Sequence, residues 1–161
     1  MASATDQTMK FLPWVILAVV IGGRSYFVRR KNRRVTQLLN EASAAMQKDD
    51  WETARQRLEV CVQQFPGAAI ARRLHGRALA QLGKLDRAED ELKMAVALEP
   101  RIAEHQADLG LFCLRYKDAE SGVTHLRAAL QLDPTLRDRL REVPTVVEAI
   151  PEPARTEFFG V

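Results

Sequence analysis

The sequence has few of the features on which small disulfide-rich, β-rich or catalytic domains depend. Two cysteines in 161 residues cannot form a disulfide framework. Aromatic residues make up only 6% of the chain, which favours helices over strands. Metal-ligand spacings, glycine-rich phosphate loops and GxSxG turns are absent from the sequence. We therefore expect no enzyme activity, no metal and no cofactor. The histidines and cysteines are expected to be packing or surface residues: His75, His105, His125, Cys61 and Cys113.

The formal net charge of +3 comes from one short block of cations. Six of the 24 lysines and arginines lie between residues 24 and 34. From Val35 onward, 17 basic and 20 acidic residues leave the rest of the chain mildly acidic. A nucleic-acid-binding domain would carry its cations across a folded face, so nucleic acid is not an expected partner.

An apolar run precedes this basic block and overlaps it. Residues 11–23 carry no charge, and the run continues to Val28 with a single interruption at Arg24. As a helix, the run would be about 27 Å long, close to the roughly 30 Å of a bilayer hydrocarbon core. We predict an N-terminal tail at 1–10, a transmembrane anchor at 11–28 and a basic juxtamembrane segment at 29–34. Residues 11–34 would then contact membrane lipid.

The cations on one side of the predicted span set its orientation. The basic side of a span stays in the cytoplasm, so the C-terminal domain is expected to be cytoplasmic, at a bacterial inner membrane or an organelle membrane. Three other interpretations of the apolar run stay open: a cleaved signal peptide, a buried core helix and a mitochondrial presequence. The neutral N-terminus and the strong charge after the run disfavour a signal peptide.

Residues of the same kind recur every 34 positions after Val35. Three prolines mark the period: Pro66, Pro100 and Pro134. Small or branched apolar residues stand at fixed offsets before them, in the sets Ala42, Gly76 and Gly110; Ala54, Ala88 and Gly122; Leu58, Leu92 and Leu126; Cys61, Ala95 and Ala129; and Val62, Val96 and Leu130. Small side chains let two antiparallel helices approach closely, so each unit is expected to be a helix pair.

The second unit shows this helix pair most clearly. Its helices are expected over residues 70–82 and 85–98, with Gly83 as the residue that ends the first. An aspartate N-cap is expected before Trp51 in the first unit. The turns of the first and third units are Lys48-Asp49-Asp50 and Lys117-Asp118.

The period and these sets of residues resemble the tetratricopeptide repeat family over residues 35–136. The resemblance implies an all-α fold, a three-repeat α-solenoid with units 35–68, 69–102 and 103–136. It also implies a concave groove, lined by the first helix of each unit, that binds peptides or partner helices. The chain departs from the family where an aromatic or a leucine is expected, at Leu38, Arg72 and Gln106 and at Glu41 and His75.

The chain after the third unit is expected to close the solenoid. Leu136, Leu140 and Val143 share one face, so we predict a C-terminal capping helix over 137–150. Residues 151–161 are expected to form a flexible tail. The Phe158-Phe159 pair in it is interpreted as a docking motif, as a plug that folds back into the chain's own groove, or as part of an inert tail.

The expected groove has an apolar strip with a cationic centre. Arg73 and Arg77 are four residues apart and share a helix face. Arginine binds carboxylates well, so an acidic and apolar segment of a partner is a natural ligand; alternatively, Glu104 and Asp108 pair with these arginines. The candidate groove residues are Leu39, Ser43, Met46, Arg73, Arg77, Leu111, Leu114 and Arg115.

The resemblance does not imply binding of chaperone tails. Members of the family that hold such tails use Lys, Asn and Arg at set positions of the groove. Those positions hold Leu39, Ser43, Leu74, Glu104 and Asp108 here. We therefore expect a membrane-anchored, non-enzymatic adaptor for a protein partner, with no small-molecule substrate. The alternatives are a structural subunit buried in a larger membrane complex and an exported periplasmic repeat domain.

Overall fold

The computed structural model describes residues 33–150 and 154–159, and the described part contains helices and turns but no strand. Residues up to Gln37 form one unit and Leu38–Val161 a second, and the second is described below. Residues 33–46 are helical. Five long helices follow: α2 (Trp51–Gln64), α3 (Ala69–Gln81), α4 (Leu85–Leu98), α5 (Ala103–Tyr116) and α6 (Ala119–Leu132). The predicted all-α class is confirmed.

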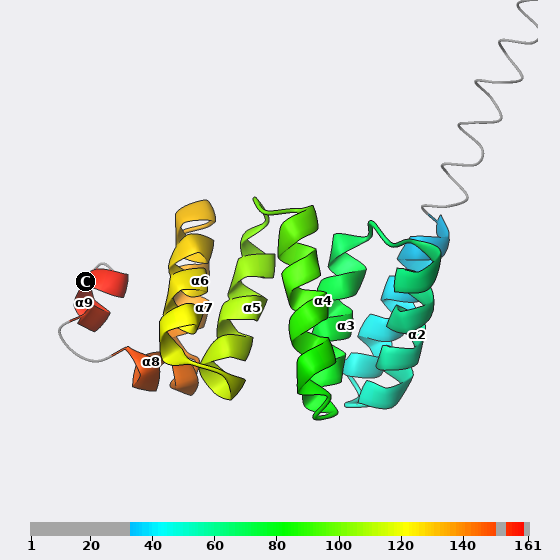
Figure 1. Ribbon diagram of the computed structural model, residues 1–161, viewed down its shortest axis with the longest axis horizontal. Helices are drawn as coiled ribbons and strands as arrows, with labels where there is room; N and C mark the ends of the chain where they lie inside the picture. The colour runs from blue at the N-terminus through cyan, green and yellow to red at the C-terminus, as the bar shows by residue number, and fades with distance from the viewer. Residues whose placement is uncertain (1–32, 151–153, 160–161) are drawn as a thin grey trace, which may run out of the picture. The chain divides into compact units, whose positions relative to one another are not determined.

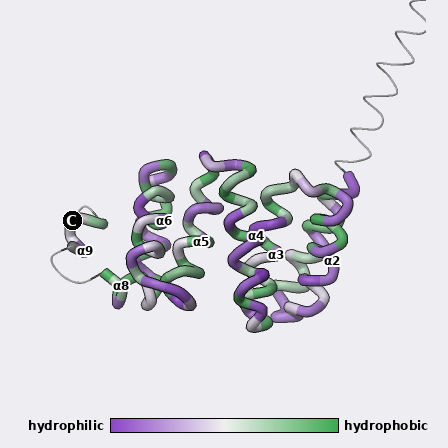
Figure 2. The backbone as a smooth tube through the Cα atoms, viewed as in Figure 1, coloured by the Kyte–Doolittle hydropathy of each residue, from purple (hydrophilic) through white to green (hydrophobic). Residues whose placement is uncertain are grey.

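The helices pack as antiparallel pairs, α3 with α4 and α5 with α6 (Figure 1). The structure gives α4 the predicted bounds and begins and ends α3 one residue earlier than predicted. Hydrophobic and hydrophilic residues are interspersed along each helix (Figure 2). The apolar residues that recur every 34 positions form the contact between the helices of a pair. These residues are fully buried: Ala54, Leu58 and Cys61 in α2, Ala88, Leu92 and Ala95 in α4, and Leu126 and Ala129 in α6.

The small residues stand where two helices meet most closely. A Cβ atom on Gly76 would lie 2.7 Å from Leu92 Cγ, and one on Gly110 would lie 2.9 Å from Leu126 Cγ. Both distances are shorter than a carbon–carbon contact allows, so a larger residue would push the pair apart. This repeated contact explains why the 34-residue period selects small residues at these positions.

The turns form as predicted in the first two units. Gly83 has a φ of 73°, and the amides of Gly83 and Lys84 bond to carbonyls of the last turn of α3, a Schellman end. Asp50 caps α2 by accepting a hydrogen bond from Thr53 N at 3.0 Å. Asp118 caps α6 in the same way, through Ser121 N at 2.7 Å. The aspartate N-cap predicted before Trp51 is therefore confirmed, and the structure adds a second one at Asp118.

The C-terminal segment differs from the prediction. The single capping helix expected at 137–150 is wrong: it is two short helices, α7 (Leu136–Arg141) and α8 (Pro144–Ala149). Pro144 has no amide hydrogen and is tolerated only in the first turn of a helix, so the chain ends one helix and starts another there.

Residues 154–159 of the expected flexible tail form α9 (Ala154–Phe159). Phe158 and Phe159 are buried in a cluster with Leu130, Leu140 and Val146, among others. The Arg141 side chain donates a hydrogen bond to Phe159 O at 3.1 Å. The pair therefore folds back onto the C-terminal end of the chain and does not plug the expected groove, since neither phenylalanine lines the pockets described below.

The predicted transmembrane anchor at 11–28 lies outside the described residues, as do the tail at 1–10 and most of the basic segment 29–34. Among the helices that the structure describes, none has the length and apolar character needed to cross a bilayer.

Candidate groove between α3, α5 and α7

Two arginines of α3 and one aspartate of α5 form the polar centre of the candidate site. Arg73 Nη1 donates to Asp108 Oδ2 at 2.6 Å, and Arg77 Nε lies 4.0 Å from the same oxygen. The side chain of Arg73 is 17% exposed and that of Arg77 is 47% exposed. Asp108 therefore does pair with the arginines, as one of the two interpretations expected. The pairing holds Arg73 in place and leaves Arg77 open to solvent.

A pocket surrounds this centre where α3, α5 and α7 meet. Its polar wall is formed by Arg73, Arg77, Glu104, Asp108 and Arg139. Its apolar wall is formed by Ala107, Leu111, Leu136, Leu140 and Val143. Three arginines against two carboxylates give this pocket a small excess of positive charge beside an apolar surface.

A second pocket continues the first along α3 and α5. The two share Arg77, Asp108 and Leu111, and the second adds Arg115 and Tyr116, among others. The Arg115 guanidinium lies over the Tyr116 ring, 5.4 Å from its centroid. The two pockets therefore form one continuous groove, with an arginine at each end and Leu111 in the middle.

The structure brings together four of the predicted groove residues: Arg73, Arg77, Leu111 and Arg115. Leu114 lies elsewhere, because its side chain packs against Gly122 in the contact between α5 and α6. Leu39, Ser43 and Met46 are partly buried on the first helix and line neither of these two pockets.

Sequence reasoning missed the part of the groove that α7 supplies. Leu136, Leu140 and Val143 were assigned to a cap, but they also face the groove beside Arg139. The pattern that identified them as a helix face was present in the sequence. What it could not show is that the first short helix of the cap occupies the place of a fourth groove helix.

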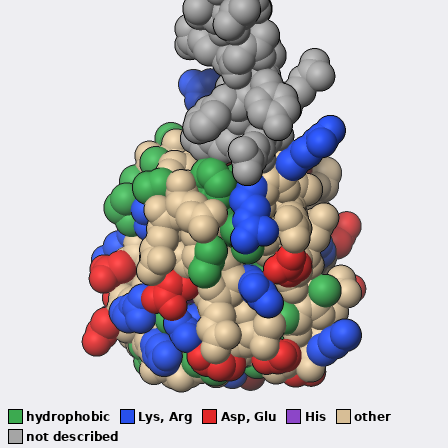
Figure 3. Space-filling model, turned by 90° about the vertical axis from the view of Figure 1, so that its right-hand side faces the viewer, with side chains coloured by type: hydrophobic (Ala, Val, Ile, Leu, Met, Phe, Trp, Pro, Cys, Tyr) green, Lys and Arg blue, Asp and Glu red, His purple; other side chains and the backbone are tan. Residues whose placement is uncertain are grey.

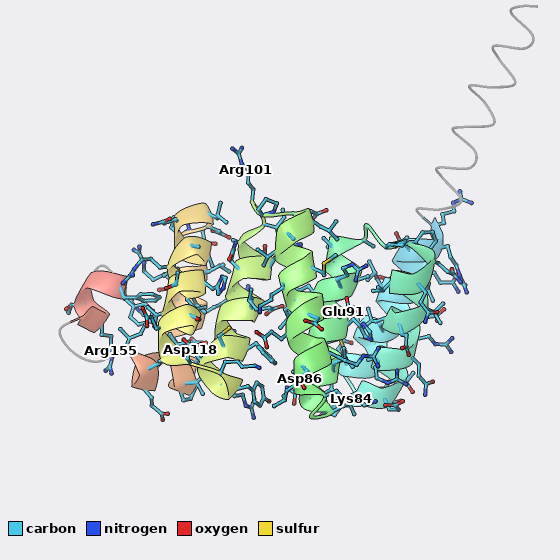
Figure 4. The ribbon with its side chains drawn as sticks, in the orientation of Figure 1. Lys84, Asp86, Glu91, Arg101, Asp118 and Arg155 are labelled. Carbon is cyan, nitrogen blue, oxygen red and sulfur yellow. The ribbon has the colours of Figure 1, made fainter. Side chains whose placement is uncertain are left out.

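A second polar cluster lies between α3 and α4. Arg72 Nη1 donates to Glu91 Oε2 at 2.8 Å, and His75 Nδ1 lies 3.3 Å from Glu91 Oε1. Burial alone would raise the pKa of Glu91, but the nearby His75 and the hydrogen bond from Arg72 outweigh it and the pKa is lowered. Glu91 is labelled in Figure 4, on α4. This cluster joins the two helices of the second unit.

The remaining candidates for chemistry are buried side chains. His75 and His105 are each 1% exposed. Cys61 and Cys113 are free and buried, and burial raises the pKa of both thiols, which keeps them protonated and unreactive. Within the part of the chain that the structure describes, no group of three or more His, Cys, Asp or Glu residues could hold a metal ion.

The paired helices and the continuous groove define an α-helical repeat scaffold. The chain belongs to the tetratricopeptide repeat family, whose model matches residues 39–100 and 74–136. No curated protein matches the chain.

Solved structures share the fold at low sequence identity. An O-GlcNAc transferase variant from Thermobaculum terrenum has a TM-score of 0.71 at 24% identity, over 80% of this chain. The chain spans 25% of that transferase's length. The TPR2B domain of yeast Sti1 in complex with pHsp70 has a TM-score of 0.64 at 18% identity, covering 73% of this chain and 95% of that one. The first TPR of Spaghetti (RPAP3), bound to an HSP90 peptide, has a TM-score of 0.64 at 16% identity, covering 73% and 93%.

Proposed function

We propose that this protein is a membrane-anchored adaptor that binds a segment of a partner protein in the groove between α3, α5 and α7. The observation that carries the proposal is the exposure of Arg77 beside Leu111, at the point where the two pockets join. Two repeat domains of similar fold are seen with chaperone peptides, which supports a peptide or helix as the kind of ligand.

The groove favours a ligand that is both acidic and apolar. Arg77, Arg115 and Arg139 surround the apolar side chains at its centre, and exposed guanidinium groups bind carboxylates with two parallel hydrogen bonds. Arg73 is largely buried and bonds to Asp108 through Nη1, so it contributes less to binding than the exposed Arg77. Glu104 and Asp108 stand where chaperone-binding relatives carry cations, so the ligand differs from a chaperone tail.

The anchor is proposed from the sequence. The apolar run at 11–28 would hold the domain at a membrane with its repeat units in the cytoplasm, as the cations at 24–34 indicate. An anchored groove meets membrane-bound partners at a higher local concentration than a free one, so modest affinity is sufficient. The protein would then act in recruitment or assembly, with no reaction of its own.

Site-specific crosslinking in intact membranes tests the proposal. A photoreactive amino acid at Leu111 should capture a discrete partner, and the same amino acid at exposed Arg127 on α6 should not. Arg77→Ala combined with Arg139→Ala should remove the Leu111 adduct while the protein remains folded. Equal adducts from both positions, or adducts unaffected by the double substitution, would show that the groove is not the binding site.

A further inference from the structure

The large apolar side chains that the described part of the structure leaves exposed lie at one edge of the repeat domain. Each is 40–48% exposed. They are Ile70, Met94, Leu98, Ile102 and Leu132. All of them stand where the first helix of a unit begins or the second one ends. Ile70 is in the first turn of α3, Leu98 and Leu132 end α4 and α6, and Ile102 directly precedes α5; Met94 lies one turn before Leu98. We call these five residues the apolar edge.

The opposite edge of the domain is polar. It consists of the turns within the units, such as Asp49-Asp50, Gly83-Lys84 and Lys117-Asp118, and holds none of these five residues. Figure 4 shows Arg101 projecting from the apolar edge, with Lys84 and Asp86 near the opposite one. Figure 3, which views the α2 end, shows hydrophobic side chains gathered in its upper part and most acidic ones in its lower part. Isolated exposed apolar residues are ordinary, but their confinement to one edge is not.

The chain enters the repeat domain at this same edge. The first helix of the domain, from Leu38 to residue 46, runs in the direction of α3 and α5, so Leu38 lies at the edge where those helices begin (Figure 1). Ten positions separate it from Val28, the end of the predicted span. Because residues 33–37 are helical, these positions extend at most about 25 Å. With residues 11–28 in a bilayer, as proposed above, a tether of this length would keep Leu38 within about 25 Å of the bilayer.

We propose that the apolar edge rests on the lipid surface, with the side chains around Ile102 in the headgroup layer. This inference rests on the proposed membrane anchor. Ile102 directly follows Arg101, and Leu98 precedes it by three residues, with Glu99 and Pro100 between them. The Arg101 guanidinium can reach lipid phosphates while Ile102 and Leu98 contact acyl carbons. The contact fixes which edge of the domain faces the membrane, so the groove is presented in one orientation.

A polarity-sensitive fluorophore on either edge tests this contact. The full chain, with Cys61→Ala and Cys113→Ala, would carry Ile102→Cys labelled with nitrobenzoxadiazole. The matched control carries the same label on Lys84→Cys, at the opposite edge. Ala95 and Ala129 occupy the place of Cys61 in the other units, and Ala45 occupies the place of Cys113 in the first unit, so alanine suits both sites. Both proteins are reconstituted in vesicles of phosphatidylcholine and phosphatidylglycerol, with and without headgroup nitroxide lipids.

The expected result is a blue-shifted emission at position 102 that the nitroxide lipids quench, with neither effect at position 84. Protein that floats with the vesicles but shows equal, unquenched emission at both positions would overturn the lipid contact while leaving the anchor intact. A blue shift that appears only in native membranes would assign the edge to a protein instead, and would also overturn the proposal. Protein that does not float with the vesicles would refute the anchor and the contact together.

Discussion

Arg72 and Glu91 join the two helices of the second unit through a hydrogen bond of 2.8 Å, at positions that the next unit fills with a different polar pair. One period later these positions hold Gln106 and His125, whose side chains are 2.9 Å apart. The tetratricopeptide pattern expects an aromatic residue at position 72. The chain replaces an apolar contact with a polar one in two consecutive units.

This correspondence makes the two pairs exchangeable. Glu91→Ala should lower the free energy of unfolding by about 1–3 kcal/mol, because Arg72 loses its acceptor in a largely buried place. The double substitution Arg72→Gln with Glu91→His copies the pair of the third unit and should recover most of that loss. Urea unfolding of the single and double variants measures both effects. A double variant no more stable than Glu91→Ala would show that the pairs depend on their surroundings.

Gly122 of α6 lies in close contact with Leu114 of α5, so a substitution at this position tests how closely the two helices approach. A Cβ atom there would lie 2.5 Å from Leu114 Cδ2 and 2.9 Å from Leu114 N. Gly122→Ala should therefore destabilise the protein by about 1–3 kcal/mol through overpacking, more than the roughly 1 kcal/mol that alanine contributes to a helix.

The residues of the second unit indicate a second substitution that should offset the cost of Gly122→Ala. It has Ala80 and Ala88 where the third has Leu114 and Gly122, and Ala88 is fully buried there. Adding Leu114→Ala to Gly122→Ala should remove the side-chain clash, so the cost of the pair should be smaller than the sum of the two single costs. Additive costs in a double-mutant cycle would contradict direct contact between these positions.

Asp49 occupies a backbone conformation that suits glycine better. Its φ is 55°, and the amides of Asp49 and Asp50 make the bonds that Gly83 and Lys84 make one period later. Asp49→Gly should stabilise the protein by about 1 kcal/mol by relieving the left-handed strain. The reciprocal Gly83→Ala should destabilise it, and only through the backbone, since nothing lies within 4 Å of a Cβ there. Thermal unfolding of the two variants should therefore shift in opposite directions.

The sequence was sufficient for the repeats because their rules are local and periodic. Small residues such as Gly76 recur with the 34-residue period, the left-handed turn of Gly83 is also found at Asp49, and the cap of Asp50 is also found at Asp118. Each of these features has the same physical role in both units that carry it. The C-terminal segment has no such copy. Nothing in the spacing of Phe158 and Phe159 shows which surface they would cover, because that surface forms only when the preceding helices pack.

The groove was predictable in part for the same reason. The period places Arg73, Arg77 and Leu111 on the first helices of their units. It does not show which arginine Asp108 holds, since that depends on the spacing between α3 and α5. The contribution of Arg139 depends on the break at Pro144, which leaves α7 beside the groove.

Acid should weaken the folded state through His105, which is buried, and His125, which is partly buried. Burial lowers the pKa of His105 and of His125 below the ordinary value of 6.5. As the pH falls below 6.5, the two histidines therefore bind protons more readily in the unfolded chain than in the folded one. The free energy of unfolding is highest above pH 6.5 and decreases as the pH falls below it. Urea unfolding in mild detergent at about pH 7.5 and about pH 5.5 should show a lower free energy of unfolding at the acidic value. His105→Gln with His125→Gln removes both groups, so this variant should show a smaller difference between the two values. The same pH dependence in the variant and the parent would assign the effect to other groups.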